Sequence, residues 1–174
     1  NAIDVAILPP ASYVLAKQRA PKLQLLASQI AYGATSYSSY ILVRADDSAQ
    51  TLGDLADRRM AFVDKRSTSG YLFPYAAFLN AGVDPTTAFS GIVYAGEHLR
   101  TIRLLLKDQV DAAATASGMM NVSRRDYKSG LDAASTRILV NAGRIPYDAL
   151  CAGAQLPASG ARKLAWAFIG VSTR

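Results

Sequence analysis

Short apolar runs alternate with amphipathic segments along most of the chain. The runs predicted as strands cover residues 3–8, 23–30, 40–44, 60–63, 92–95, 109–115, 137–141 and 147–152. Apolar residues at helical spacing predict helices over 11–19, 71–81, 98–107, 116–128 and 159–169. The tetrad Thr-Leu-Gly-Asp at 51–54 resembles a capping box that opens a further short helix, ending at Arg58 or Arg59. This alternation indicates βαβ units and predicts an α/β fold with a mostly parallel sheet.

The stretch 64–74 carries an unusual set of hydroxyls between a predicted strand and a predicted helix. Ser67, Thr68 and Ser69 are followed directly by Gly70. The first backbone N–H groups of a helix lack intrahelical partners and lie at the positive end of its dipole, so they can bind an anion. Serine and threonine are also preferred helix caps, which need no ligand. The residues alone therefore leave anion binding and simple capping as two interpretations.

The motif at 67–74, Ser-Thr-Ser-Gly-Tyr-Leu-Phe-Pro, resembles the signature of the phosphate/phosphite/phosphonate-binding family of ABC-transporter periplasmic substrate-binding proteins. Further segments match the family in the same order, at 3–6, 40–46, 51–55, 94–98, 110–115 and 145–148. The resemblance implies a periplasmic-binding-protein-like (type II) two-lobe fold, with mainly parallel sheets flanked by helices. It also implies that the chain is a fragment lacking the N-terminal part of the first lobe.

The resemblance implies that the chain consists of three ranges, each of which belongs to one of the two lobes. Residues 1–44 form a partial lobe 1, residues 45–147 form a complete lobe 2 with the hydroxyl-rich turn, and residues 148–174 return to lobe 1. The ligand-binding residues that the resemblance implies are Ser67, Thr68, Ser69, Gly70, His98, Asp148 and Tyr37.

His98 is the only histidine and follows the only glutamate, Glu97. The residues alone favour a solvated helix N-terminus here, because a carboxylate is stabilised by the helix dipole; only the resemblance places His98 in a pocket. Two departures from the family pattern concern the ligand. Leu8 and Pro9 stand where members often carry an aromatic residue and a glycine, and Met119 stands about where aminoalkylphosphonate binders hold the amine with an acidic residue.

Composition narrows the classes of function. With 51% hydrophobic and 18% charged residues, the sequence is that of a globular protein. The net charge of +6 comes from scattered basic residues, which disfavours nucleic-acid binding and favours an anionic solute. A single cysteine, Cys151, excludes an internal disulfide and a multi-cysteine metal site, and its apolar neighbours predict burial. No apolar run approaches the roughly 20 residues of a membrane span.

Catalytic patterns are absent from the sequence. Neither Ser67 nor Ser69 lies in a Gly-x-Ser-x-Gly elbow, and the chain has no Gly-x-x-x-x-Gly-Lys-Ser/Thr phosphate loop. We therefore expect a non-enzymatic protein without cofactor or metal.

The predicted function is that of a solute-binding component of an ABC importer for phosphonate, phosphite or phosphate-like oxyanions. The anion would bind at a helix N-terminus between two lobes, and the protein would be periplasmic or otherwise extracytoplasmic, with a membrane anchor in the parent protein left open. The expected partners are an ABC permease or a sensor protein, with association through the truncated lobe as a further contact. The alternatives are the effector-binding domain of a LysR-type transcription regulator and a sensor domain with the same fold.

Overall fold

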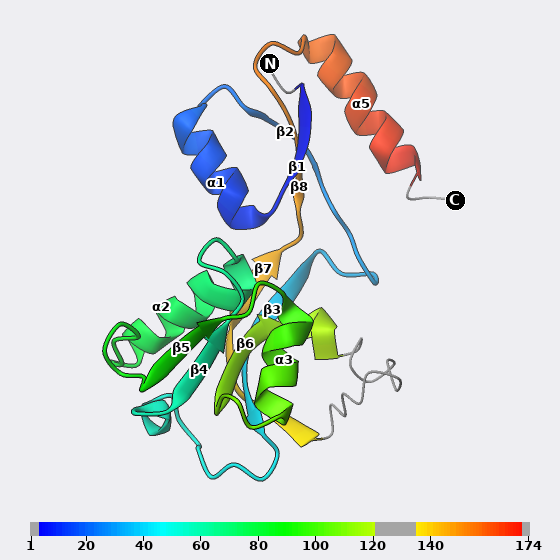
Figure 1. Cartoon of the computed structure of the whole chain (residues 1–174). Helices are drawn as coiled ribbons and strands as arrows, with labels where there is room; N and C mark the ends of the chain where they lie inside the picture. Colours follow the sequence, from blue (N-terminus) through cyan, green and yellow to red (C-terminus); the bar gives the residue numbers. More distant parts are fainter. Residues whose placement is uncertain (1–3, 121–134, 172–174) are drawn as a thin grey trace. The chain divides into compact units, whose positions relative to one another are not determined.

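The computed structural model describes residues 4–120 and 135–171, and the chain divides into two compact units (Figure 1). One unit combines Asn1–Ser36 with Pro146–Arg174, and the other is the continuous stretch Tyr37–Ile145. Most of the helix predicted over 116–128 lies outside the described residues, although residues 117–120 are helical. The predicted lobe boundaries at 44/45 and 147/148 stay predictions, and residues 37–44 lie in the second unit.

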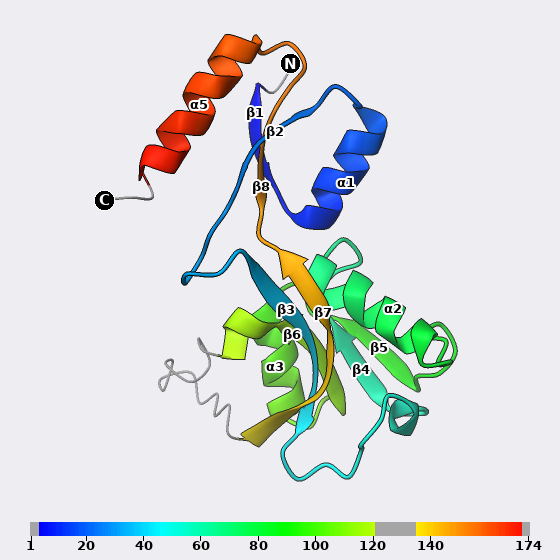
Figure 2. The same ribbon diagram turned by 180° about the vertical axis from the view of Figure 1, so that it is seen from behind.

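The first unit is built on a three-stranded sheet with the order β1-β8-β2. Its elements are β1 (Val5–Leu8), α1 (Pro10–Arg19), β2 (Gln24–Ser28), β8 (Ala149–Ala152) and α5 (Ala158–Val171). Both outer strands run antiparallel to β8. The expectation of mostly parallel pairing is therefore wrong for this sheet, because β8 inserts from the far end of the chain between the two strands that α1 connects. Helices α1 and α5 lie on opposite sides of the strands (Figures 1 and 2).

The second unit is built on a five-stranded sheet with the order β5-β4-β6-β3-β7. Its strands are β3 (Ser36–Arg44), β4 (Arg59–Phe62), β5 (Gly91–Tyr94), β6 (Ala112–Ala116) and β7 (Thr136–Pro146). Strand β4 pairs in parallel with β5 and β6, as helical crossovers allow, whereas β3 pairs antiparallel with β6. The sheet is thus mixed rather than mainly parallel. Figure 2 shows β3 and β7 side by side.

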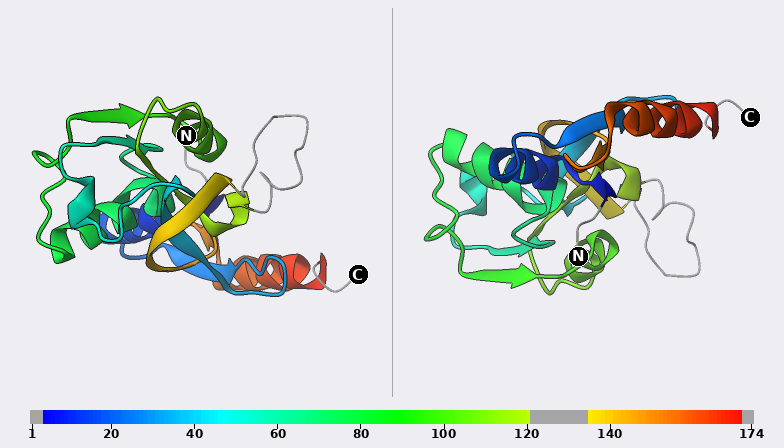
Figure 3. Two further views of the ribbon diagram at one scale, coloured as in Figure 1. Left: turned by 90° about the horizontal axis from the view of Figure 1, so that it is seen from below. Right: turned by 90° about the horizontal axis from the view of Figure 1, so that it is seen from above.

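Alternating side chains of the central strands build two separate cores in this unit. One face packs against α2 (Phe73–Asn80) through Phe78, with Ile41, Val43, Met60, Phe62, Ala112 and Ala114. The other face packs against α3 (His98–Leu106) through Ile102 and Leu105, with Leu42, Ala61 and Ala113. Views along the vertical axis of Figure 1 also place α2 and α3 on opposite sides of the sheet (Figure 3). Successive side chains of a strand point to opposite faces of the sheet, so the position of a residue in the strand determines whether it faces α2 or α3.

Two local predictions are corrected. The expected helix at 51–59 is only a 3₁₀ turn, Gly53–Leu55, although the capping box forms: the Asp54 carboxylate accepts hydrogen bonds from the backbone N–H groups of Gln50 (2.9 Å) and Thr51 (2.8 Å). The chain leaves helical geometry at Ala56 (ψ 141°). Strand β3 begins at Ser36 rather than Tyr40, since Ser39 pairs across the sheet with Ala116.

Candidate anion-binding site

The hydroxyl-rich turn joins β4 to a helical segment that starts with a π-helical turn. This turn, Thr68–Leu72, runs directly into α2. Ser67 is its cap: the backbone is extended (φ −71°, ψ 122°), and Oγ accepts a hydrogen bond from the Gly70 N–H over 3.0 Å. The Ser67 carbonyl accepts from the Leu72 N–H at 3.0 Å, a five-residue spacing. Helix capping thus explains the presence of one of the three hydroxyl residues, Ser67. The π-helical geometry is a separate indication, because π-helical turns are frequent at functional sites.

Position 70 has room only for a glycine, because Val63, which directly follows β4, lies against it. A Cβ added there would lie 2.3 Å from Val63 Cγ2 and 2.5 Å from Val63 Cβ. The Val63 N–H also donates to the Gly70 carbonyl at 3.0 Å. The close neighbour that a glycine accommodates here is therefore the Val63 side chain of the same unit.

The other two hydroxyl residues, Thr68 and Ser69, are nearly buried, at 6% and 2% exposure. The carbonyl of Ser69 accepts a hydrogen bond from Ser39 Oγ over 2.7 Å, and Ser39 is completely buried. This bond fastens the turn to β3. Sequence reasoning missed Ser39 because it predicted the strand to start only at residue 40.

His98 is the first residue of α3 and comes two residues after Gly96, whose φ of +84° turns the chain after β5. Its Nδ1 lies 3.2 Å from Thr115 Oγ1 and accepts a hydrogen bond from the Ala116 N–H, also over 3.2 Å. Burial lowers the pKa of His98 below its ordinary value. Because Nδ1 accepts from a backbone N–H, the hydrogen bonds fit a neutral imidazole that is held at the end of β6 and is partly buried there.

Residues that follow β4 and residues that end β6 meet at one edge of the sheet. The two strands are parallel, so their carboxyl ends coincide, and open α/β sheets bind ligands at that edge. Ser39 and Ala116 are direct partners across β3 and β6. Ser39 bonds to the turn through the Ser69 carbonyl, and Ala116 bonds to the His98 ring. Because Ser39 and Ala116 are neighbours, the turn and His98 are attached to adjacent positions of the sheet. Tyr37 lies at the same end of β3, two residues before Ser39 and on the same face.

Two cations precede the turn. Lys65 Nζ lies 5.4 Å from the centre of the Tyr94 ring, and Arg66 is paired with Asp64 at 3.4 Å. Both basic side chains are exposed, so they raise the local potential without being buried in the turn.

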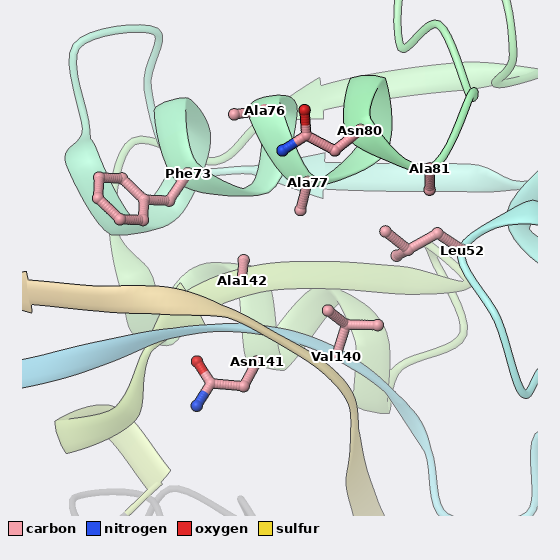
Figure 4. Close-up of a pocket in the computed structure, with 9 residues that line it drawn as sticks. All are labelled: Leu52, Phe73, Ala76, Ala77, Asn80, Ala81, Val140, Asn141 and Ala142. Atoms are coloured by element: carbon pink, nitrogen blue, oxygen red, sulfur yellow. The ribbon is translucent and has the colours of Figure 1, made fainter.

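Asp148 lies in the first unit, whereas the turn lies in the second, so its place in a common site stays a prediction. Its carbonyl accepts from the Gln29 N–H at 3.0 Å, and the residue helps to line a cavity of about 470 Å³ with Ile7, Ile30, Leu150 and Phe168. A hollow of about 570 Å³ in the second unit lies between α2 and β7 (Figure 4). It is lined by alanines of α2, Phe73 and Leu52, and none of the expected ligand residues borders it.

Within residues 4–120 and 135–171, no group of three or more His, Cys, Asp or Glu side chains could hold a metal ion. In the same residues, no helix has the length and apolar character needed to cross a bilayer.

Residues 1–174, the whole chain, match the family described as ABC transporter, phosphonate, periplasmic substrate-binding protein. The chain belongs to this family. Its members are extracytoplasmic substrate-binding components of transporters and not enzymes, and the LysR-type alternative finds no support.

Individual relatives agree with the family assignment. The phosphate-import protein PhnD of Mycolicibacterium smegmatis is 33% identical over 141 residues, which cover 74% of this chain and 44% of that protein. The chain thus spans less than half of this relative.

Solved structures share the fold at low identity. XAC2383 from Xanthomonas citri bound to chloride ion has a TM-score of 0.83 at 18% identity, covering 99% of this chain and 64% of that one. PhnD1 from Prochlorococcus marinus in complex with methylphosphonate has a TM-score of 0.73 at 19% identity, covering 97% and 63%. The fold is the α/β, periplasmic-binding-protein-like type II fold, present in part.

Proposed function

We propose that this chain binds a small tetrahedral oxyanion of phosphorus, namely a phosphonate, phosphite or phosphate, as the solute-binding component of an ABC importer. The observation that carries the proposal is the convergence of the 67–70 turn and His98 on neighbouring residues at the carboxyl edge of the sheet. The relative from M. smegmatis is named for phosphate import, and the P. marinus structure holds methylphosphonate. Both ligands belong to the proposed class.

The chemistry of the edge suits such an anion. A phosphonate offers three oxygens that accept hydrogen bonds, and the edge offers hydroxyls from Thr68 and Ser69, backbone N–H groups at the start of a helical segment, and the His98 ring. Hydrogen bonds to an ionised acceptor are about twice as strong as neutral ones. The hydroxyl, amide and imidazole groups at this edge therefore match the acceptors of such an anion.

The ligand proposed here lacks an amine. Met119, at the position where an amine-binding carboxylate is expected, packs against the apolar core on the α3 face. A buried ammonium with only Asp148 as a candidate carboxylate partner is disfavoured, because a desolvated charge needs close compensation. We therefore expect methylphosphonate, phosphite or phosphate to bind more tightly than 2-aminoethylphosphonate.

The first unit also supports the expected self-association. Its large exposed apolar side chains include Ile7, Val14, Leu15, Leu25, Ile30, Trp166 and Phe168. Exposed apolar surface of this kind favours contact between copies of the chain. Light scattering over a concentration series is expected to show reversible association, and a constant monomer mass would contradict it.

Calorimetric titration with methylphosphonate, phosphite, phosphate and sulfate tests the binding proposal. Ser69→Ala is expected to weaken binding about tenfold or more, because a hydrogen bond to a charged group contributes roughly 1.5–3 kcal/mol. Ser90→Ala is the matched control, since Ser90 is an exposed serine just before β5, at the other edge of the sheet. Failure of all three phosphorus oxyanions to bind, or equal affinity in Ser69→Ala, would contradict the proposal.

A further inference from the structure

The hydrogen bonds of His98 define which ring nitrogen carries the proton. Nδ1 accepts from the Ala116 N–H at 3.2 Å and lies 3.2 Å from the Thr115 hydroxyl. A backbone amide can only donate, so Nδ1 must present its lone pair. The proton of the neutral ring therefore lies on Nε2, at the opposite edge of the imidazole from β6.

A second proton on this ring is disfavoured by the surrounding structure. It would place an Nδ1–H directly against the Ala116 N–H, and a cation at this position would lie at the positive end of α3. Burial acts in the same direction and lowers the pKa of His98. Three independent causes thus keep the ring neutral.

The charged and titratable groups on the adjacent elements leave this conclusion unchanged. Strand β6 presents none, because residues 112–116 are four alanines and Thr115. Glu97 is paired with Arg103 at 3.6 Å, and Arg100 bonds to the Ala95 carbonyl at 3.4 Å. Further titratable groups among the described residues include Tyr37 and Tyr40 of β3, Tyr94 of β5, and Asp64, Lys65 and Arg66 after β4.

We infer that Thr115 is a positioning residue: together with the Ala116 amide, its hydroxyl holds the His98 ring so that Nε2–H faces a bound oxyanion as a neutral donor. The inference rests on the proposed function for its ligand. Thr115 is completely buried on the face of β6 that packs against α3, so its hydroxyl has a fixed place beside the ring. Without the hydroxyl, the Ala116 amide is the one remaining hydrogen bond described here that orients the ring, so rotation about χ2 and population of the second tautomer become easier.

Long-range ¹H–¹⁵N spectra of the imidazole test this inference directly in the ligand-free chain, because His98 is the only histidine. We expect a single Nε2–H tautomer at pH 7. In Thr115→Val we expect the Nδ1–H tautomer to become populated and the affinity for methylphosphonate to fall about fivefold. Thr115→Ser keeps the hydroxyl and is expected to restore both properties.

Thr101→Val is the matched control. Thr101 is also completely buried, and its hydroxyl donates to the backbone carbonyls of His98 (2.7 Å) and Ala114 (3.1 Å) without touching the ring. It is expected to lose stability while keeping the tautomer and the affinity.

An Nδ1–H ring or an imidazolium in the parent at pH 7 would overturn the inference, as would a Thr115→Val variant that keeps one Nε2–H tautomer or full affinity. If the parent binds none of the three phosphorus oxyanions, the proposed function fails. The imidazole spectra still decide the role of Thr115 in that case.

Discussion

Ser39 Oγ donates a 2.7 Å hydrogen bond to the carbonyl oxygen of Ser69, joining β3 to the hydroxyl-rich turn in a completely buried position. Neither residue is near the other in sequence, and no other hydroxyl at the start of β3 is as deeply buried. The turn is thereby held by a neighbouring strand as well as by its own cap, Ser67.

Replacement of Ser39 by alanine is expected to destabilise the second unit and to weaken anion binding. It leaves the Ser69 carbonyl buried without its partner, which costs about 1–3 kcal/mol. Urea denaturation measures the first effect and calorimetry with methylphosphonate the second. Ser38→Ala is the control, because the Ser38 hydroxyl accepts a long, exposed hydrogen bond of 3.5 Å from the Asn141 amide. Equal stability of the two variants would show that the buried bond contributes nothing.

Replacement of Gly70 by alanine is expected to be strongly destabilising. The new methyl group would lie 2.3 Å from Val63 Cγ2, and overpacking of this kind costs about 1–3 kcal/mol. Gly91→Ala serves as the control, since no atom lies within 4 Å of an added Cβ there. The double variant Val63→Ala/Gly70→Ala is expected to recover part of the loss in thermal denaturation. If the losses of stability in the two single variants simply add up in the double variant, Val63 and Gly70 are not in contact.

The ion pairs at the amino edge of the same sheet are expected to make stability depend on acid pH. Arg59 bonds to both Asp111 oxygens (2.8 and 2.9 Å), and Arg44 lies 3.6 Å from the same carboxylate. The hydrogen bonds from Arg59 hold the pKa of Asp111 well below its ordinary value of 3.8. A depressed carboxyl pKa stabilises the fold above the unfolded-state pKa and loses this contribution as pH falls toward the folded-state pKa.

Urea denaturation from pH 7 to pH 2.5 measures this effect. Asp111→Asn is expected to lose about 1–3 kcal/mol at pH 7 and to show a flatter pH profile than the parent. The exposed residue Asp46 supplies the control, Asp46→Asn. A parent profile as flat as that of Asp111→Asn would contradict the assignment.

Cys151 is expected to be inert in the native protein. It is completely buried in β8, and burial raises the pKa of its thiol, which lowers the thiolate fraction. Reaction with a disulfide reagent at pH 8 should be on the order of a hundredfold slower than in urea, because it requires local opening of the first unit. Rapid native labelling would show that β8 is readily displaced.

The sequence predicted best what short-range periodicity determines. Helix α3 begins at His98 as predicted, because Leu99, Ile102 and Leu105 mark its buried face within the segment itself. The three parallel strands β4, β5 and β6 were likewise found from their apolar runs.

Predictions failed where a partner distant in sequence decides the structure. The hydroxyl run 36–39 has weak strand character, and it becomes a strand because Ser39 pairs with Ala116. For the same reason, the sequence did not identify Ser39 and Thr115 as residues of the candidate site. Ser39 interacts with Ser69 and Thr115 interacts with His98, and no rule of sequence spacing predicts either contact. The antiparallel sheet of the first unit also arises from one strand contributed late in the chain.

The place of β8 between β1 and β2 has a consequence for the order of folding. The second unit is continuous, so its sheet can form as soon as residue 145 has been synthesised, whereas β1 and β2 have no strand between them until residue 152 follows. Contacts of such large sequence separation form slowly, because a long loop must close before they gain any stabilisation. The second unit, which carries the hydroxyl-rich turn and His98, is therefore expected to fold first on the ribosome, and the first unit to fold last, around a strand that the chain must bring back from its far end.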